Sequence, residues 1–208
     1  MKKECKQRFA KIILMLSAQD QKSHIRLLNG QTIRSDANKD IIDTYYIFRC
    51  VNKNNKNDVD RIICGTTAAK DFLQLAGLTA PPIFNMLHDS SIGSASNSNG
   101  TISKQTDIWN ESAKQLYNAI MILITAWNLK PGPIYKYLEN AKRYKYCVPF
   151  VNRVDQINQI IHRHNTSLRN IINTLAQNND IKNYEFNLLE DILHHDNILS
   201  YFEDENGR

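Results

Sequence analysis

Cations and aromatic rings alternate in two short stretches, Tyr135-Lys136-Tyr137 and Arg143-Tyr144-Lys145-Tyr146. Such alternation suits single-stranded nucleic acid, because the rings can stack on bases while the cations meet phosphates. The same pattern also fits an amphipathic helix whose tyrosines pack inward, since Tyr is often half-buried. Both interpretations stay open on the sequence alone.

Basic residues are gathered in blocks along the chain. The net charge is +5, and residues 1–35 hold eight Lys and Arg against two acids. Residues 180–208 reverse the sign, with eight acids against Lys182 and Arg208. Segregation of this kind can build a positive face that attracts phosphate, or it can be neutralised inside the molecule. A second basic block, at 130–170, is opposed only by Glu139 and Asp155 and contains Lys130, Lys136, Lys142, Arg143, Lys145, Arg153, Arg163 and Arg169.

Cys50 and Cys64 flank a segment whose order is similar to a treble-clef zinc finger. Such a finger uses a Cys-x-x-Cys knuckle, a hairpin and a second Cys-x-x-Cys at a helix start to surround one ion. Lys53 and Thr67 stand where the two remaining thiolates would be. We therefore expect no cofactor and no metal, with Cys50 and Cys64 only as weak candidate ligands. Either the finger is degenerate, or these are two buried free cysteines.

If the finger shape is present, cations would decorate it and touch a phosphate backbone or a partner protein. These cations are Lys53, Lys56, Arg61 and Lys70.

Two carboxylate–histidine pairs are spaced four residues apart, Glu190 with His194 and Asp191 with His195. Each pair would share one face of a helix, but two ligands do not make a metal site. The chain has no nucleotide-binding glycine loop, no nucleophile elbow and no H-E-x-x-H motif. We predict no catalytic residues and a protein that is not an enzyme, although a site assembled from distant residues is a third possibility.

The periodicity predicts a mostly α fold. A small α+β part comes first, with a β-hairpin followed by a helix in a degenerate treble-clef-like order, and a C-terminal helical bundle follows. The hairpin is expected from strands at 44–51 and 59–64, and its helix at 68–76 would be capped by Thr66 or Thr67 and ended by Gly77. Other helices are expected at 8–19, 107–129, 134–145, 152–164, 167–177 and 184–202.

The Ser, Gly and Asn content of residues 89–104 predicts a linker or long loop between an α+β domain at 1–88 and a helical domain at 105–208. The longest apolar helical run is far shorter than the roughly 20 residues that cross a bilayer. We expect no membrane partner, reduced cysteines and a cytoplasmic location.

We expect a nucleic-acid-associated subunit, binding DNA or RNA through its basic segments beside partner proteins. The order of blocks, with Cys50 and Cys64-Gly65 in the front part, resembles the layout of large-subunit-like proteins of type IV CRISPR effector complexes. That resemblance implies contact with guide RNA or target DNA in a defence system or mobile element. The alternative is a protein-interaction module, such as a phage- or plasmid-borne inhibitor or adaptor acting through its helical surface.

Overall fold

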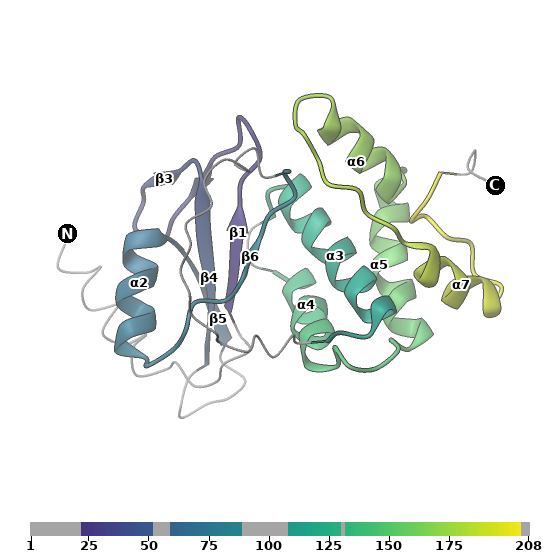
Figure 1. The fold of residues 1–208 in the computed structure, drawn as a ribbon, viewed down its shortest axis with the longest axis horizontal. Helices are drawn as coiled ribbons and strands as arrows, with labels where there is room; N and C mark the ends of the chain where they lie inside the picture. The colour runs from purple at the N-terminus through teal and green to yellow at the C-terminus, as the bar shows by residue number, and fades with distance from the viewer. Residues whose placement is uncertain (1–21, 52–58, 89–107, 130–131, 205–208) are drawn as a thin grey trace, which may run out of the picture. The chain divides into compact units, whose positions relative to one another are not determined.

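The computed structural model describes residues 22–51, 59–88, 108–129 and 132–204 (Figure 1). The chain forms two compact units: the first contains the residues up to Met86 together with Leu123–Glu139, and the second contains Leu87–Ile122 and Asn140–Arg208. The division expected from the sequence stays a prediction, because its linker lies outside the described residues. The helix expected at 8–19 and the turn expected at 52–58 also lie outside them.

The first unit contains a long antiparallel strand pair (Figure 1). Strand β5 (Val59–Gly65) pairs along its whole length with residues 45–51 of β4 (Thr44–Val51). Both strands are rich in β-branched and aromatic residues, which favour a pleated, half-buried surface. The pair predicted from the sequence is therefore confirmed.

Further strands extend this pair into a four-stranded mixed sheet with the order β5-β4-β1-β6. Strand β1 (Lys22–Arg26) pairs antiparallel to β4, and β6 (Ile83–Phe84) pairs parallel to β1. Strands β2 (Ile33–Arg34) and β3 (Asp40–Ile41) form a separate two-stranded sheet. None of these four strands is expected from the sequence.

Helix α2 (Thr66–Leu75) covers one face of the four-stranded sheet (Figure 1). Its Ala69, Phe72 and Leu73 pack into a cluster with buried strand residues, Tyr46, Phe48, Cys50, Ile62 and Cys64. The expectation of a threonine cap is wrong: the N-cap is Gly65, with no side-chain capping bond. The hydroxyl of Thr66 lies 3.2 Å from that of Thr44 instead.

Gly77 ends α2, as the sequence predicts. Its φ of +62° is left-handed, a conformation that glycine adopts without steric cost. The N–H of Gly77 donates to the carbonyl of Gln74, and the N–H of Leu78 donates to the carbonyl of Leu73. This Schellman arrangement turns Leu78 onto the apolar cluster under the helix.

The opposite face of the sheet buries Ile25, Tyr45, Ile47 and Ile63. Residues of Leu123–Glu139 belong to this unit and bond to its loops. Gln31 Nε2 donates to the carbonyl of Thr125 (2.9 Å), and Asn128 Nδ2 donates to the carbonyl of Thr32 (2.8 Å).

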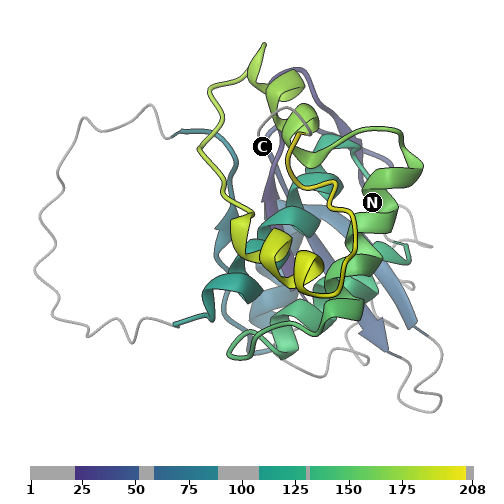
Figure 2. The ribbon, with the colours of Figure 1, turned by 90° about the vertical axis from the view of Figure 1, so that its right-hand side faces the viewer.

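A five-helix region follows the sheet. Its helices are α3 (Glu111–Ala126), α4 (Ile134–Arg143), α5 (Val151–Arg163), α6 (Leu168–Ala176) and α7 (Asn187–His195). Within the second unit, α7 packs against α5 (Figure 2). Among the described residues, no helix has the length and apolar character needed to cross a membrane.

The helix expected at 184–202 is wrong in its extent, because α7 spans only Asn187–His195. Phe186 stands at its N-cap, and Asn197 adopts a φ of +57° just after its end. The N–H of Ile198 bonds back to the carbonyl of Leu193 at 2.9 Å, so the chain closes a Schellman turn and leaves the helix. The following residues up to Phe202 are therefore irregular.

Asparagine ends three helices of this region in the same way. Asn128 follows α3 with a φ of +47°, Asn165 follows α5 with +50°, and Asn197 follows α7 with +57°. Asn is the commonest residue after glycine in this left-handed position. The asparagine richness of the chain thus has a local structural use.

Replacing Asn197 by Ala should lower the free energy of unfolding by about 1 kcal/mol, because a left-handed backbone costs an ordinary L-residue roughly that much. Asn197→Gly should be neutral or slightly stabilising. Asn183→Ala is a matched control, since Asn183 is exposed and has an ordinary φ. Urea denaturation of the three variants measures the differences, and equal effects of the two alanine substitutions would refute the role of the turn.

Candidate nucleic-acid interface

Asn110 joins the start of α3 to the segment after α4. Its side-chain oxygen accepts hydrogen bonds from the N–H of Ala113 and the hydroxyl of Ser112, which makes it the cap of α3. Its own N–H donates to the carbonyl of Lys145 at 2.9 Å. Trp109 and Lys145 are neighbours in space for this reason, although 35 residues separate Asn110 from Lys145.

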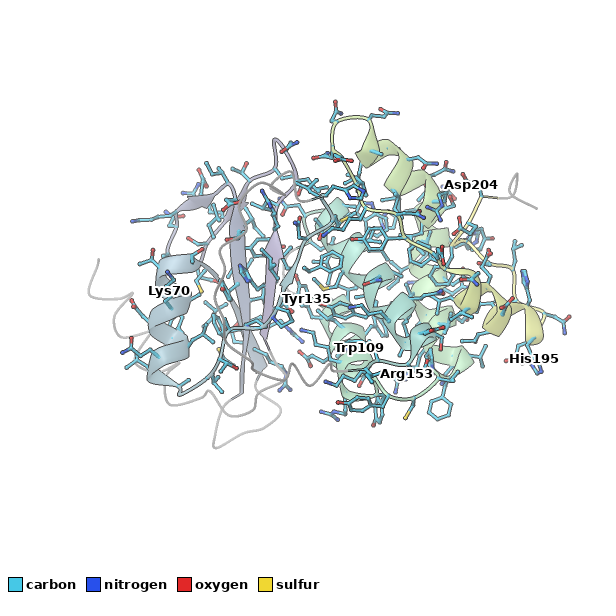
Figure 3. All side chains as sticks on the ribbon, viewed as in Figure 1. Lys70, Trp109, Tyr135, Arg153, His195 and Asp204 are labelled. Atoms are coloured by element: carbon cyan, nitrogen blue, oxygen red, sulfur yellow. The ribbon has the colours of Figure 1, made fainter. Side chains whose placement is uncertain are left out.

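Three aromatic rings and two ammonium groups meet at this junction, and we call Trp109, Lys114, Tyr117, Lys145 and Tyr146 the aromatic–lysine cluster. The rings of Trp109 and Tyr117 lie 4.9 Å apart. Lys114 Nζ lies 5.1 Å from the first ring centre and 4.9 Å from the second. Lys145 Nζ lies 6.0 Å from the Trp109 ring and 5.0 Å from the Tyr146 ring. The position of Trp109 in this cluster can be found by its label in Figure 3.

Lys114 and Lys145 each place an ammonium group over π faces, an attraction worth about 0.5–1 kcal/mol at exposed sites. Lys114 is exposed and Lys145 is half-buried. Burial of Tyr117 raises its pKa to about 12, so its phenol stays neutral at physiological pH. The Tyr117 phenol therefore adds no negative charge beside the two lysines.

Flat aromatic surface is exposed at Tyr146 of the cluster and at Tyr144, two residues earlier in the chain. Tyr144 is 55% exposed and Tyr146 is 64% exposed. Tyr135, by contrast, is buried, and its hydroxyl donates to the carbonyl of Leu129. Of the two alternating stretches in the sequence, Arg143-Tyr144-Lys145-Tyr146 thus presents rings and cations to solvent, whereas the Tyr135 stretch contributes a core residue.

The other predicted binding residues fall into distinct groups. Arg61 and Arg169 are held in ion pairs with Glu139 and Glu203. Lys53 and Lys56 lie outside the described residues. The exposed members are Lys70, Lys136, Arg143 and Arg163, and the half-buried members are Lys142 and Arg153. Their part in nucleic-acid binding stays a prediction.

Arg169 connects the basic block to the acidic one. Its Nε and one terminal nitrogen each contact a carboxylate oxygen of Glu203 at 2.7 Å, and that nitrogen also donates to the carbonyl of Tyr184. The bond to Glu203 raises the pKa of Arg169 above its usual value, against the opposing effect of burial. Two-point pairing of this kind fixes geometry as well as charge.

Cys50 and Cys64 are both free and buried. Cys64 lies opposite Tyr46 and Cys50 opposite Asp60, so the two are four positions apart along the strands, roughly 13 Å at about 3.3 Å per residue. Burial raises the pKa of Cys50 to about 11 and that of Cys64 to about 12. Both thiols are therefore protonated at physiological pH.

His194 and His195 are exposed in the last turn of α7. Nδ1 of His195 lies 3.3 Å from a carboxylate oxygen of Asp196. Within the described parts of the chain, three or more His, Cys, Asp or Glu side chains nowhere gather closely enough to hold a metal ion.

The sequence reading missed Trp109, Lys114 and Tyr117. Lys114 and Tyr117 are three residues apart, the spacing that brings two side chains together on a helix, and this was the available local signal. The approach of Trp109 to Lys145 has no such signal, because it depends on a backbone hydrogen bond between distant segments.

Comparisons with known proteins found no matching family model, no similar curated protein and no similar solved structure.

Proposed function

We propose that the protein is a non-enzymatic nucleic-acid-binding subunit that binds single-stranded DNA or RNA at the aromatic–lysine cluster and acts beside partner proteins. The observation that carries this proposal is the placement of Lys114 and Lys145 over aromatic faces next to the exposed rings of Tyr144 and Tyr146. Single strands are favoured over duplex because their unstacked bases offer faces to aromatic side chains.

Fluorescence anisotropy with labelled single- and double-stranded oligonucleotides of DNA and RNA tests the proposal. Tyr146→Ala should weaken single-strand binding about tenfold, because stacking on one base contributes about 1–3 kcal/mol. Lys145→Ala should weaken binding and reduce the salt dependence by about one unit of slope, as expected for the loss of one phosphate contact.

Lys39→Ala is the control for Lys145→Ala, since Lys39 is an exposed lysine in the first unit. It should leave affinity unchanged within error. Lys70→Ala separately tests the predicted contribution of α2. If wild-type protein binds none of the four oligonucleotides at low salt, or if Lys39→Ala and Lys145→Ala act alike, the proposed site is refuted.

A protein-interaction module is the second candidate. It is favoured by the Arg169–Glu203 pair, in which one arginine of the basic block is paired with a carboxylate of the acidic block. Co-purification from cells, followed by identification of bound protein and nucleic acid, distinguishes the two. Protein partners without nucleic acid would favour the module.

Three further structural expectations are part of this proposal. They are a treble-clef-like shape for β4, β5 and α2, bundle packing of the C-terminal helices, and the layout of type IV CRISPR large-subunit-like proteins. The treble-clef-like shape is supported only by the order of two strands and a helix, since the strand register keeps Cys50 and Cys64 too far apart to share an ion.

A further inference from the structure

A groove lies between the start of α5 and the last turn of α7, both in the second unit. Its volume is about 560 Å³, within the usual range for binding sites of about 300–1,000 Å³. We call it the Phe150 groove. It is lined by Val148, Pro149, Phe150, Val151, Asp191, Ile192, His195 and Asp196.

Phe150, at the edge of this groove, is an unusual residue for a helix N-cap. It occupies the N-cap of α5, where Ser, Thr, Asp or Asn would bond to a free N–H, and it forms no such bond. Helix α6, by contrast, has a common N-cap residue, Ser167, whose hydroxyl oxygen accepts a hydrogen bond from the N–H of Asn170. Phe186 also stands at an N-cap, but it is fully buried and belongs to the core, whereas Phe150 is 78% exposed.

The Phe150 side chain therefore provides no cap and little buried area to the fold. Val148, two residues earlier, is 60% exposed. A neighbouring pair of large exposed apolar side chains beside a groove is typical of a protein-binding surface. Ile192 adds apolar lining from the α7 side of the groove.

The α7 side of the groove is acidic. Asp191 and Asp196 line it, and the lining contains no Lys or Arg. The same carboxylates repel phosphate, so the groove does not suit a nucleic-acid strand.

From these features we infer that the Phe150 groove binds a basic peptide segment of a partner protein, with an apolar or aromatic side chain packed on Phe150 and Val148 and a Lys or Arg facing Asp191 and Asp196. The inference is independent of the aromatic–lysine cluster, because the groove residues are not part of it. It predicts a partner class: a chain carrying a short motif in which a large apolar residue stands next to Lys or Arg.

Selection of a phage-displayed library of random peptides against the immobilised full chain tests the inference. Peptides combining Lys or Arg with a large apolar residue should be enriched, and Phe150→Ser should weaken their binding at least tenfold. Because Ser is a good N-cap, this variant should unfold at the same temperature as wild type or slightly higher. Loss of binding then cannot be ascribed to misfolding.

Reversing the charge of the groove carboxylates tests the electrostatic part of the inference directly. The double variant Asp191→Lys, Asp196→Lys should lose the basic peptides and select acidic ones. Asp180→Lys, a charge reversal at an exposed position outside the groove lining, should leave selection unchanged. Enrichment of no motif, or of peptides that bind Phe150→Ser as tightly as wild type, overturns the inference.

Oligonucleotide binding by the same variants separates this result from the proposed function. Phe150→Ser should bind oligonucleotides as wild type does. A loss of oligonucleotide binding in Phe150→Ser would mean that the groove serves nucleic acid, and it would overturn the peptide assignment.

Discussion

Replacing Glu139 by Gln should lower the free energy of unfolding by about 2–3 kcal/mol, the largest effect we expect from removing one charge in this protein. Arg49 and Arg61 are directly opposite each other in the β4–β5 pair. Like charges in that position destabilise a sheet. Glu139 lies between them, 3.3 Å from Arg49 Nε and 3.0 Å from a terminal nitrogen of Arg61.

The size of this effect follows from partial burial. The three side chains are 20%, 15% and 25% exposed for Arg49, Arg61 and Glu139. Breaking a fully buried pair costs about 3–5 kcal/mol, whereas exposed pairs contribute about 1 kcal/mol or less. Residual solvent access reduces the expected value, and the presence of two arginines on one carboxylate raises it.

A double-mutant cycle measured by urea denaturation checks the mechanism. In an Arg49→Gln background, Glu139→Gln should cost clearly less, because two arginines no longer face each other. Asp71→Asn, which removes an exposed carboxylate on α2, is the control and should change stability by less than about 0.5 kcal/mol. An equal cost of Glu139→Gln in both backgrounds would contradict the account.

Replacing Asn158 by Leu should destabilise the second unit by about 3 kcal/mol. Asn158 is fully buried in α5. Its Nδ2 donates to the carbonyl of Leu199 (2.8 Å), and its Oδ1 accepts from the N–H of Tyr201 (2.7 Å). Leucine has a similar branched shape, although it is larger, and it leaves two backbone groups without their side-chain partners, each of which costs about 1–3 kcal/mol when buried.

A local measurement distinguishes this mechanism from a general loss of packing. Hydrogen exchange at the Tyr201 amide should become faster in Asn158→Leu before the core amides change. The amides of Leu168 and Arg169, which donate to the carbonyls of Tyr201 and Phe202, should follow. Asn152→Leu, at an exposed position on the same helix, should leave both exchange and stability near wild type. Uniform acceleration of all amides would argue against a local anchor.

Most of the strands and helices that local patterns predict are found, although the helix expected at 184–202 is shorter and the one expected at 8–19 lies outside the described residues. Strand β4 and helix α2 follow from dense β-branched and aromatic residues and from Gly77, features that act within a few residues. Strand β1 (Lys22–Arg26) could not be predicted this way, because Ile25 is its one apolar residue. The strand forms because it pairs with β4 on one side and β6 on the other. Strand β6 follows Pro81 and Pro82, and it pairs with one neighbour at the edge of the sheet, where proline is tolerated.

The candidate site also contains one part that the sequence predicts and one part that it does not. The segment Arg143-Tyr144-Lys145-Tyr146 is evident from its alternation, and Trp109 is not, because its position depends on the bond between Asn110 and Lys145. Arg61 shows what residue type alone leaves out. Its charge makes it a natural candidate for phosphate binding, but its cross-strand position opposite Arg49 and the nearby Glu139 tie it to the sheet. Charge alone could not reveal that partner.

The discontinuous composition of the first unit has a consequence for synthesis on the ribosome. The sheet and α2 are complete in sequence by Met86, but this unit also requires Leu123–Glu139. Domains generally fold from the N-terminus as they emerge, at about 5–20 residues per second. Here the sheet face that carries Arg49 and Arg61 still lacks Glu139 and must wait for some fifty further residues, or about 3–10 seconds at those rates. During that interval the nascent chain exposes an unneutralised, partly apolar surface, so chaperone dependence would be concentrated in this stage of synthesis.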